Sequence, residues 1–228
     1  MIIGAVQKTT LLDYPGKVAC TVFLPGCNLR CPFCHNPGLV LPGAFRGGVS
    51  EEALFAFLQK RRGILDGVCI TGGEPTVHPD LPGLIRKIRD LGYLVKLDTN
   101  GSHPAMLRRL TEEGLLDFVA MDIKNSPEKY ALTCGGIDIL PAVRESAALL
   151  MGGQTEYEFR TTVCSLHTEA DLRSIGAWLH GDSPYYLQNF VDSGSLVGTG
   201  ISALSDGQIR SLLRAVLPDL PNARIRGL

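Results

Sequence analysis

The chain has 228 residues, of which 45% are hydrophobic and 20% charged, and its formal net charge is −1. This composition is typical of a globular protein with a sizeable core, and the balanced charge does not indicate a nucleic acid or an anionic membrane as a partner. No apolar run approaches the roughly 20 residues that span a bilayer, and the N-terminus lacks the pattern of a signal peptide. We therefore expect a cytoplasmic protein, whose seven cysteines are ligands, catalysts or core residues rather than disulfides.

Strand-like and helix-like segments alternate along the chain. Runs rich in β-branched residues predict strands, while capping residues, first-turn prolines and terminal glycines predict the helix ends. The expected strands are 17–24, 67–71, 93–98, 117–124, 157–163 and 185–190, with a last short strand within 223–228. The expected helices are 50–63, 80–92, 104–114, 139–152, 169–181 and 205–217. These six βα units predict an α/β fold with a parallel sheet and outer helices, and no change of composition divides residues 1–228 into two domains.

Unusual residues follow five of these strands. The cysteine loop "CNLRCPFC" comes after the first strand and "GGEPT" after the second, while "DTNG", "DIK" and "NF" close the third, fourth and sixth. Ligands of α/β folds bind at the carboxyl ends of the strands. The sequence therefore predicts one site to which all five strand ends contribute.

The loop places Cys27, Cys31 and Cys34 in a Cys-x3-Cys-x2-Cys spacing. A closed structural zinc site needs four ligands, often as two separated pairs, and no second pair of cysteines is present. A [4Fe–4S] cluster normally takes one thiolate per iron. Three thiolates would leave one iron open for a small molecule.

Four other cysteines lie outside the loop. Cys20, Cys69 and Cys164 fall in apolar strands, and we interpret them as small core residues. Cys134 is followed by two glycines, and we expect it to be exposed.

The loop "CNLRCPFC" resembles the cluster-binding loop of the radical S-adenosylmethionine (SAM) superfamily. The resemblance implies an incomplete (β/α)6 TIM-like barrel, and one [4Fe–4S] cluster held by Cys27, Cys31 and Cys34. It also implies that SAM chelates the open iron and is cleaved reductively to methionine and a 5′-deoxyadenosyl radical, which then abstracts a hydrogen atom.

Further residues are assigned to SAM by this resemblance. In "GGEPT", whose alternative interpretation is an ordinary βα turn, the backbone of Gly72 and Gly73 and the side chain of Glu74 would bind the SAM ammonium. "DTNG" and "DIK" resemble motifs of the pyruvate formate-lyase activating enzyme, in which the equivalents of Asp122 and Lys124 hold SAM for the reaction. Asp98 would also lie at SAM, and with Thr99 it would bind a monovalent cation, although an aspartate at a strand end is often only a helix cap.

The remaining predictions concern the residues around the adenosine of SAM and the charged side chain of Arg160. We expect Phe33 to lie near the adenine and His35 to be part of the site, although a lone histidine is more often a surface or core residue. Arg160 is a charge in an interior strand and needs a partner, for which the SAM carboxylate or ribose is a candidate. Asn189 falls where the pyruvate formate-lyase activating enzyme has a Tyr-His pair at adenosine, but the histidine is absent here.

The opening "GAVQKTTLLDYPGKVACTVFLPGCNLRCPFCHNP" resembles activating proteins of glycyl-radical enzymes, above all that of anaerobic ribonucleoside-triphosphate reductase. The resemblance implies that the substrate is a glycine of a partner enzyme and that a flavodoxin or ferredoxin supplies the electron. The lack of further cysteine arrays, the lack of an added C-terminal domain and a barrel open on one side all favour a protein substrate. Two alternatives remain: a radical SAM enzyme acting on a small molecule such as a deazapurine precursor, and an electron carrier or redox sensor, which would not need "GGEP" or "DIK".

Overall fold

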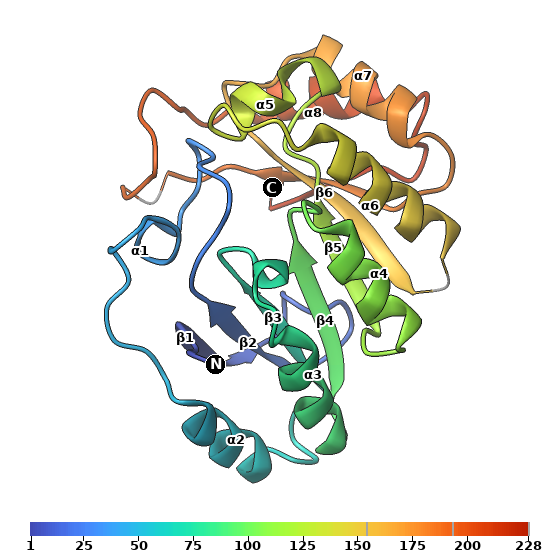
Figure 1. Cartoon of the computed structure of the whole chain (residues 1–228). Helices are drawn as coiled ribbons and strands as arrows, with labels where there is room; N and C mark the ends of the chain where they lie inside the picture. The colour runs from blue at the N-terminus through green and yellow to red at the C-terminus, as the bar shows by residue number, and fades with distance from the viewer. Residues whose placement is uncertain (154, 193, 228) are drawn as a thin grey trace.

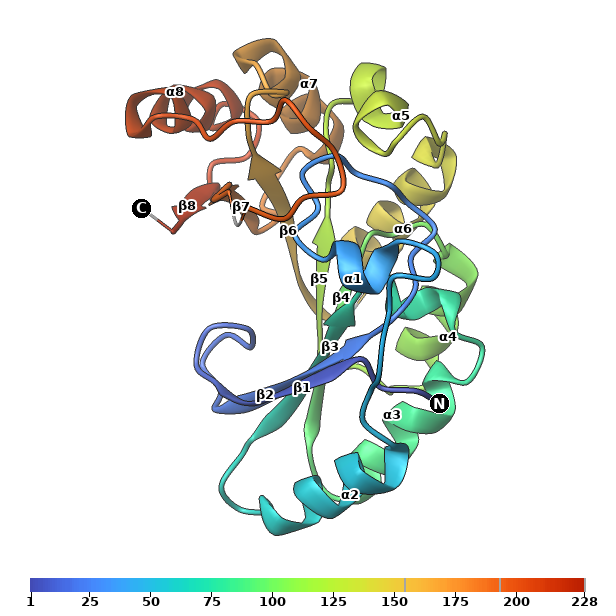
Figure 2. The same ribbon diagram turned by 90° about the vertical axis from the view of Figure 1, so that its left-hand side faces the viewer.

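A single curved sheet organises the chain in the computed structural model, which describes residues 1–153, 155–192 and 194–227 (Figures 1 and 2). The sheet has eight strands in the order of the sequence, from β1 at one edge to β8 at the other. β1 runs antiparallel to β2, and every later neighbour is parallel. The strands are β1 (Ala5–Thr10), β2 (Ala19–Leu24), β3 (Gly67–Gly72), β4 (Leu94–Thr99), β5 (Phe118–Asp122), β6 (Glu156–Val163), β7 (Tyr185–Asn189) and β8 (Arg224–Arg226).

The six predicted βα units and the last short strand are confirmed, with Leu228 of the predicted segment outside the described residues. β1 was not predicted. Most of its residues are exposed, because it is an edge strand with one neighbour, so it lacks the apolar run that marks the interior strands.

Helices cover the outer face of the sheet (Figures 1 and 2). Local signals fix their starts: the Ser50 side chain accepts a hydrogen bond from the amide of Ala53, and Thr168 and Ser205 each form a capping box. None of the described helices is both long and apolar enough to cross a membrane. The helices are α1 (Pro37–Val40), α2 (Glu51–Lys60), η1 (Pro75–Val77), α3 (Leu81–Asp90), α4 (Pro104–Glu112), η2 (Pro127–Lys129), α5 (Tyr130–Thr133), α6 (Leu140–Gly152), α7 (Glu169–Leu179) and α8 (Asp206–Val216).

The two faces of the sheet differ in chemistry. Apolar strand residues such as Ile70, Leu97 and Val119 are fully buried and form the core with the outer helices. Charged residues of β4, β5 and β6 instead alternate with these apolar residues, which places them on the concave face. This polar interior opens at the carboxyl ends of the strands, where the predicted motifs lie.

Candidate active site

Hydrogen bonds to backbone carbonyl groups hold the cysteine loop in place. The Arg30 guanidinium donates to the carbonyl oxygens of Cys27 at 2.8 Å and Leu29 at 2.6 Å, and the amide of Cys34 donates to the carbonyl of Cys31 at 3.0 Å. Burial raises the pKa of the Cys27 thiol to about 11. Within the described residues, no three His, Cys, Asp or Glu side chains converge where a single metal ion could bind, so the ligand role of the three cysteines stays a prediction.

Cys20, Cys69 and Cys164 are fully buried, as predicted, but the expectation that Cys134 is exposed is wrong. The carbonyl of Cys134 accepts a hydrogen bond from the amide of Arg30 at 3.3 Å. The Cys134 thiol beside Cys31 lowers the pKa of the Cys31 thiol below its ordinary value. Gly135 and Gly136 are exposed, as expected of a turn, but Cys134 before them is buried against the cysteine loop.

The glycines of "GGEPT" are required by packing within the protein. Gly72 has φ +125°, and a Cβ on it would lie 2.3 Å from the carbonyl oxygen of Leu24. A Cβ on Gly73 would lie 1.9 Å from the carbonyl oxygen of Gly26. The amide of Glu74 also donates to that oxygen at 2.8 Å. The turn after β3 therefore packs directly against the chain that leads into the cysteine loop.

The carboxylate of Glu74 is fully engaged by the protein. It accepts hydrogen bonds from the amide and hydroxyl of Thr76, from the hydroxyl of Thr99 at 2.7 Å and from the amide of Asn100 at 2.6 Å. Burial raises its pKa against the effect of these donors. Glu74 thus ties the turn after β3 to the turn after β4, and its predicted contact with the SAM ammonium stays a prediction.

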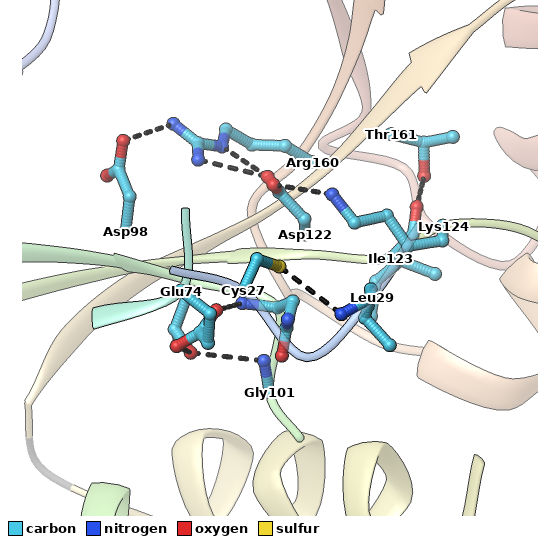
Figure 3. A network of polar contacts seen from close by, with 12 residues as sticks. Cys27, Leu29, Glu74, Asp98, Gly101, Asp122, Ile123, Lys124, Arg160 and Thr161 are labelled. Carbon is cyan, nitrogen blue, oxygen red and sulfur yellow. Dashed lines mark hydrogen bonds and ion pairs between the residues drawn. The ribbon is translucent and has the colours of Figure 1, made fainter. Parts of the chain in front are cut away.

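Four charged side chains form a row across three strands (Figure 3). Arg160 contacts Asp98 at 3.4 Å on one side and Asp122 at 2.9 Å on the other, and Asp122 contacts Lys124 at 2.9 Å. Burial opposes the charge of Asp122, but Lys124 and Arg160 outweigh it and lower its pKa to about 2. Burial likewise disfavours the charge of Lys124, yet Asp122 raises its pKa above the ordinary value.

Two side chains that the sequence analysis missed hold the "DIK" segment. His167 Nδ1 accepts from the amide of Cys164 at 3.2 Å, so Nε2 carries the proton and donates to the carbonyl of Lys124 at 3.0 Å. Burial lowers the pKa of His167, which keeps the ring neutral. The hydroxyl of Tyr130 accepts from the amide of Lys124 at 3.2 Å. His167 follows β6 directly, so the rule that site residues follow strand ends could have identified it.

These elements surround one pocket at the carboxyl ends of the strands. Two predicted residues do not line this pocket: Arg160, which contacts Asp98 and Asp122, and Asn189, the last residue of β7. The pocket is lined by the predicted residues Cys27, Cys31, Phe33, Cys34, His35, Gly72, Gly73, Glu74, Asp98, Thr99, Asp122 and Lys124, together with Leu29, Asn36, Val40, Thr71, Asn100 and Thr162.

Comparison with known proteins gives the family. The radical SAM superfamily model matches residues 21–150, which is more than half of the chain and includes the cysteine loop. The chain belongs to the radical SAM superfamily. It is therefore an enzyme, and membership of this superfamily implies a [4Fe–4S] cluster and SAM.

Two curated relatives belong to different functional classes. The "Putative glycyl-radical enzyme activating enzyme MJ1227" of Methanocaldococcus jannaschii is 32% identical over 196 residues, which are 83% of this chain and 80% of that protein. A 7-carboxy-7-deazaguanine synthase of Aquifex aeolicus is 39% identical over 80 residues, 35% of this chain and 34% of that protein. The first likeness extends over most of both proteins, whereas the second is confined to about a third of each.

The solved structure of QueE from Escherichia coli has a TM-score of 0.58 with 17% identity, and the alignment covers 100% of this chain and 94% of that one. At this identity the likeness shows the fold alone. It agrees with the incomplete barrel that the sequence analysis predicted for a radical SAM enzyme.

An aromatic contact joins the cysteine loop to the residues at the end of β7. His35 stacks on Phe190, with ring centroids 5.2 Å apart and planes inclined by 27°, so the cysteine loop and the end of β7 are in contact. Asn189 Oδ1 is buried and is the one such side-chain atom, among the described residues, without a hydrogen-bond partner. A buried acceptor without a donor is costly, but neither Asn189 nor Phe190 lines the pocket, so the contact of Asn189 with adenosine stays a prediction.

Proposed function

We propose that this radical SAM enzyme is an activase, which generates a glycyl radical on a partner protein, most specifically an anaerobic ribonucleoside-triphosphate reductase. The observation that carries the proposal is the likeness to a "Putative glycyl-radical enzyme activating enzyme" over 83% of this chain and 80% of that protein. It is combined with a pocket that gathers the cysteine loop, the glycine turn and the "DIK" segment. We take residues 1–228 as a single radical SAM domain.

In this proposal Cys27, Cys31 and Cys34 would hold one [4Fe–4S] cluster, and SAM would bind at the iron that has no cysteine ligand. When bound, the cluster supplies one electron that splits SAM into methionine and a 5′-deoxyadenosyl radical. A flavodoxin or ferredoxin replaces that electron. The radical takes the α-hydrogen of the partner's glycine, which leaves 5′-deoxyadenosine and a glycyl radical.

The chain's own residues orient SAM. Lys124, at the pocket end of the charged row, would bind the SAM carboxylate, and the neighbouring Asp122 its ribose or ammonium. Carbonyl groups of the turn at Gly72 and Gly73 would accept from the ammonium, because the Glu74 carboxylate already has four donors. His35, which lines the pocket and stacks on Phe190 at the end of β7, would lie beside the adenosine.

The test uses anaerobically reconstituted protein, SAM, a one-electron reductant and the cognate reductase. A doublet-type organic radical should appear in electron paramagnetic resonance only when all four are present, and replacement of the reductase glycine by alanine should remove it. Deuterium on that glycine should pass to 5′-deoxyadenosine. If SAM is cleaved but no label leaves the glycine, the activase proposal fails while the SAM site remains.

The match to a 7-carboxy-7-deazaguanine synthase favours one second candidate, a radical SAM reaction on a small heterocycle. The two candidates differ in what is consumed. Release of 5′-deoxyadenosine in step with the loss of a deazapurine precursor, without any partner protein, would support the second candidate over the activase.

A further inference from the structure

Lys96 is a buried lysine that none of the predicted motifs contains. It lies in β4, and its side chain is 1% exposed. Lysine is almost never buried to this extent unless it is paired. Its ammonium pairs with Asp98 Oδ1, and it lies 3.8 Å from Cys69 Sγ and 6.0 Å from the centroid of the Phe118 ring. Lys96 therefore extends the charged row by one cation, on the side of Asp98 away from Lys124.

Each carboxylate oxygen of Asp98 already has a cationic partner. Oδ1 receives the Lys96 ammonium, and Oδ2 lies 3.4 Å from the guanidinium of Arg160. The hydroxyl of Thr99, the other residue expected to bind a monovalent cation, donates to Glu74 at 2.7 Å and accepts from the amide of Gly101 at 3.1 Å. A metal cation between these residues would be a third positive charge on a carboxylate that two cations already neutralise, so the expected cation does not fit this site.

We propose that the Lys96 ammonium is the site's built-in monovalent cation. It neutralises and positions Asp98 at the wall of the SAM pocket, so SAM binding requires no added alkali ion. Lys96 acts through Asp98 and does not line the pocket, which makes it a positioning residue. The inference rests on the proposed SAM site, but the neutralisation of Asp98 by Lys96 can also be tested without SAM.

The first experiment measures SAM affinity of the anaerobically reconstituted full chain by equilibrium dialysis, in buffers whose monovalent cation is potassium, sodium or choline. Choline is too large to enter a carboxylate site inside the barrel. We expect the wild-type protein to bind SAM equally in all three buffers. Affinity that falls in choline and returns with potassium would overturn the proposal.

The second experiment uses Lys96→Met, which keeps the length of the side chain and removes its charge. We expect SAM affinity about tenfold weaker than wild type in choline, because one charge-assisted contact of Asp98 is lost, with partial recovery in potassium or sodium. Lys87→Met is the matched control, because Lys87 is exposed and pairs with Glu51 outside the site. A Lys96→Met protein that binds SAM like wild type in choline would contradict the inference.

The third measurement omits SAM, which separates this inference from the proposed function. Thermal unfolding is followed in choline and in potassium buffer for wild type and Lys96→Met. Potassium should raise the midpoint of the variant and leave that of wild type unchanged. A wild-type midpoint that responds to potassium would refute the built-in cation even if SAM binds as proposed, and it needs no folded variant.

Discussion

Replacing Lys124 with methionine tests the SAM site most directly. The Lys124 ammonium lies 2.9 Å from Asp122 and 5.9 Å from the centroid of the Phe33 ring, and its side chain is 17% exposed. Methionine has a similar length and is apolar, so it retains most of the packing against Phe33 while removing the charge. Because the pKa of Lys124 is raised by Asp122, the charge that is lost is present at every pH near neutrality.

The expected size of the effect follows from the contact that is removed. A hydrogen bond to a charged group contributes about 1.5–3 kcal/mol, which corresponds to roughly 10- to 150-fold in affinity. Asp122 keeps the contact with Arg160 at 2.9 Å in the variant, so the row of charges is shortened rather than broken. We therefore expect SAM affinity to fall within this range and iron content to stay at the wild-type level.

The assay is equilibrium dialysis with labelled SAM under anaerobic conditions, with iron determined on the same samples. Lys129→Met is the control, because Lys129 pairs with Asp171 at 2.6 Å and is 38% exposed, outside the pocket. An unchanged Kd for Lys124→Met at full iron content would remove Lys124 from the SAM site. A parallel loss of iron would show instead that the residue supports the cysteine loop.

Three further predictions concern the cluster, the turn and the charged row. Cys31→Ala should lose the iron of the reconstituted protein and its absorbance, whereas Cys69→Ala should keep both; the reverse result would contradict the ligand assignment. Gly73→Ala should greatly reduce soluble yield or the thermal midpoint, because its Cβ would lie 1.9 Å from a backbone oxygen, whereas Gly83→Ala has open space and should not. Asp122→Asn should lower the free energy of unfolding at neutral pH by about 2 kcal/mol. The pKa of Asp122 is lowered to about 2, so its contribution to the free energy of unfolding is complete above about pH 4 and is lost as the pH falls toward 2. A difference in unfolding free energy between variant and wild type that grows as the pH falls over this interval would refute the assignment.

The βα units were predictable because each carries local signals. Alternating apolar strands and capped helices are encoded within about ten residues, and Ser50, Thr168 and Ser205 cap their helices as those signals require. β1 and the short helices have no such signal. β1 is held by one neighbour at an edge of the sheet, so its stability comes from pairing that a local pattern does not reveal.

Site residues that follow strand ends could be predicted from the sequence. Residues whose role depends on being buried against distant parts of the chain could not. Cys134 was expected at the surface because its glycines predict a turn, and the sequence does not show that this turn packs against Arg30. Arg160 was expected to need a partner, and it has two in Asp98 and Asp122, whose proximity no local pattern shows. Lys96 was not predicted as a site residue, because the sequence does not show that this strand lysine is buried beside Asp98.

The concave face also explains why the pocket suits a ligand with a carboxylate. Residues two apart on a strand point to the same face, so Lys96 and Asp98 of β4 lie on the face to which Asp122 and Arg160 belong on β5 and β6. Counted from Lys96 through Asp98, Arg160 and Asp122 to Lys124, the row has three cations and two anions, and each contact joins opposite charges. Asp98, Asp122 and Lys124 line the pocket, and Lys124 is the cation of the row that a ligand carboxylate would contact there. The strands thus set the electrostatics of the site before SAM binds, and the loops add the cysteines and the backbone acceptors.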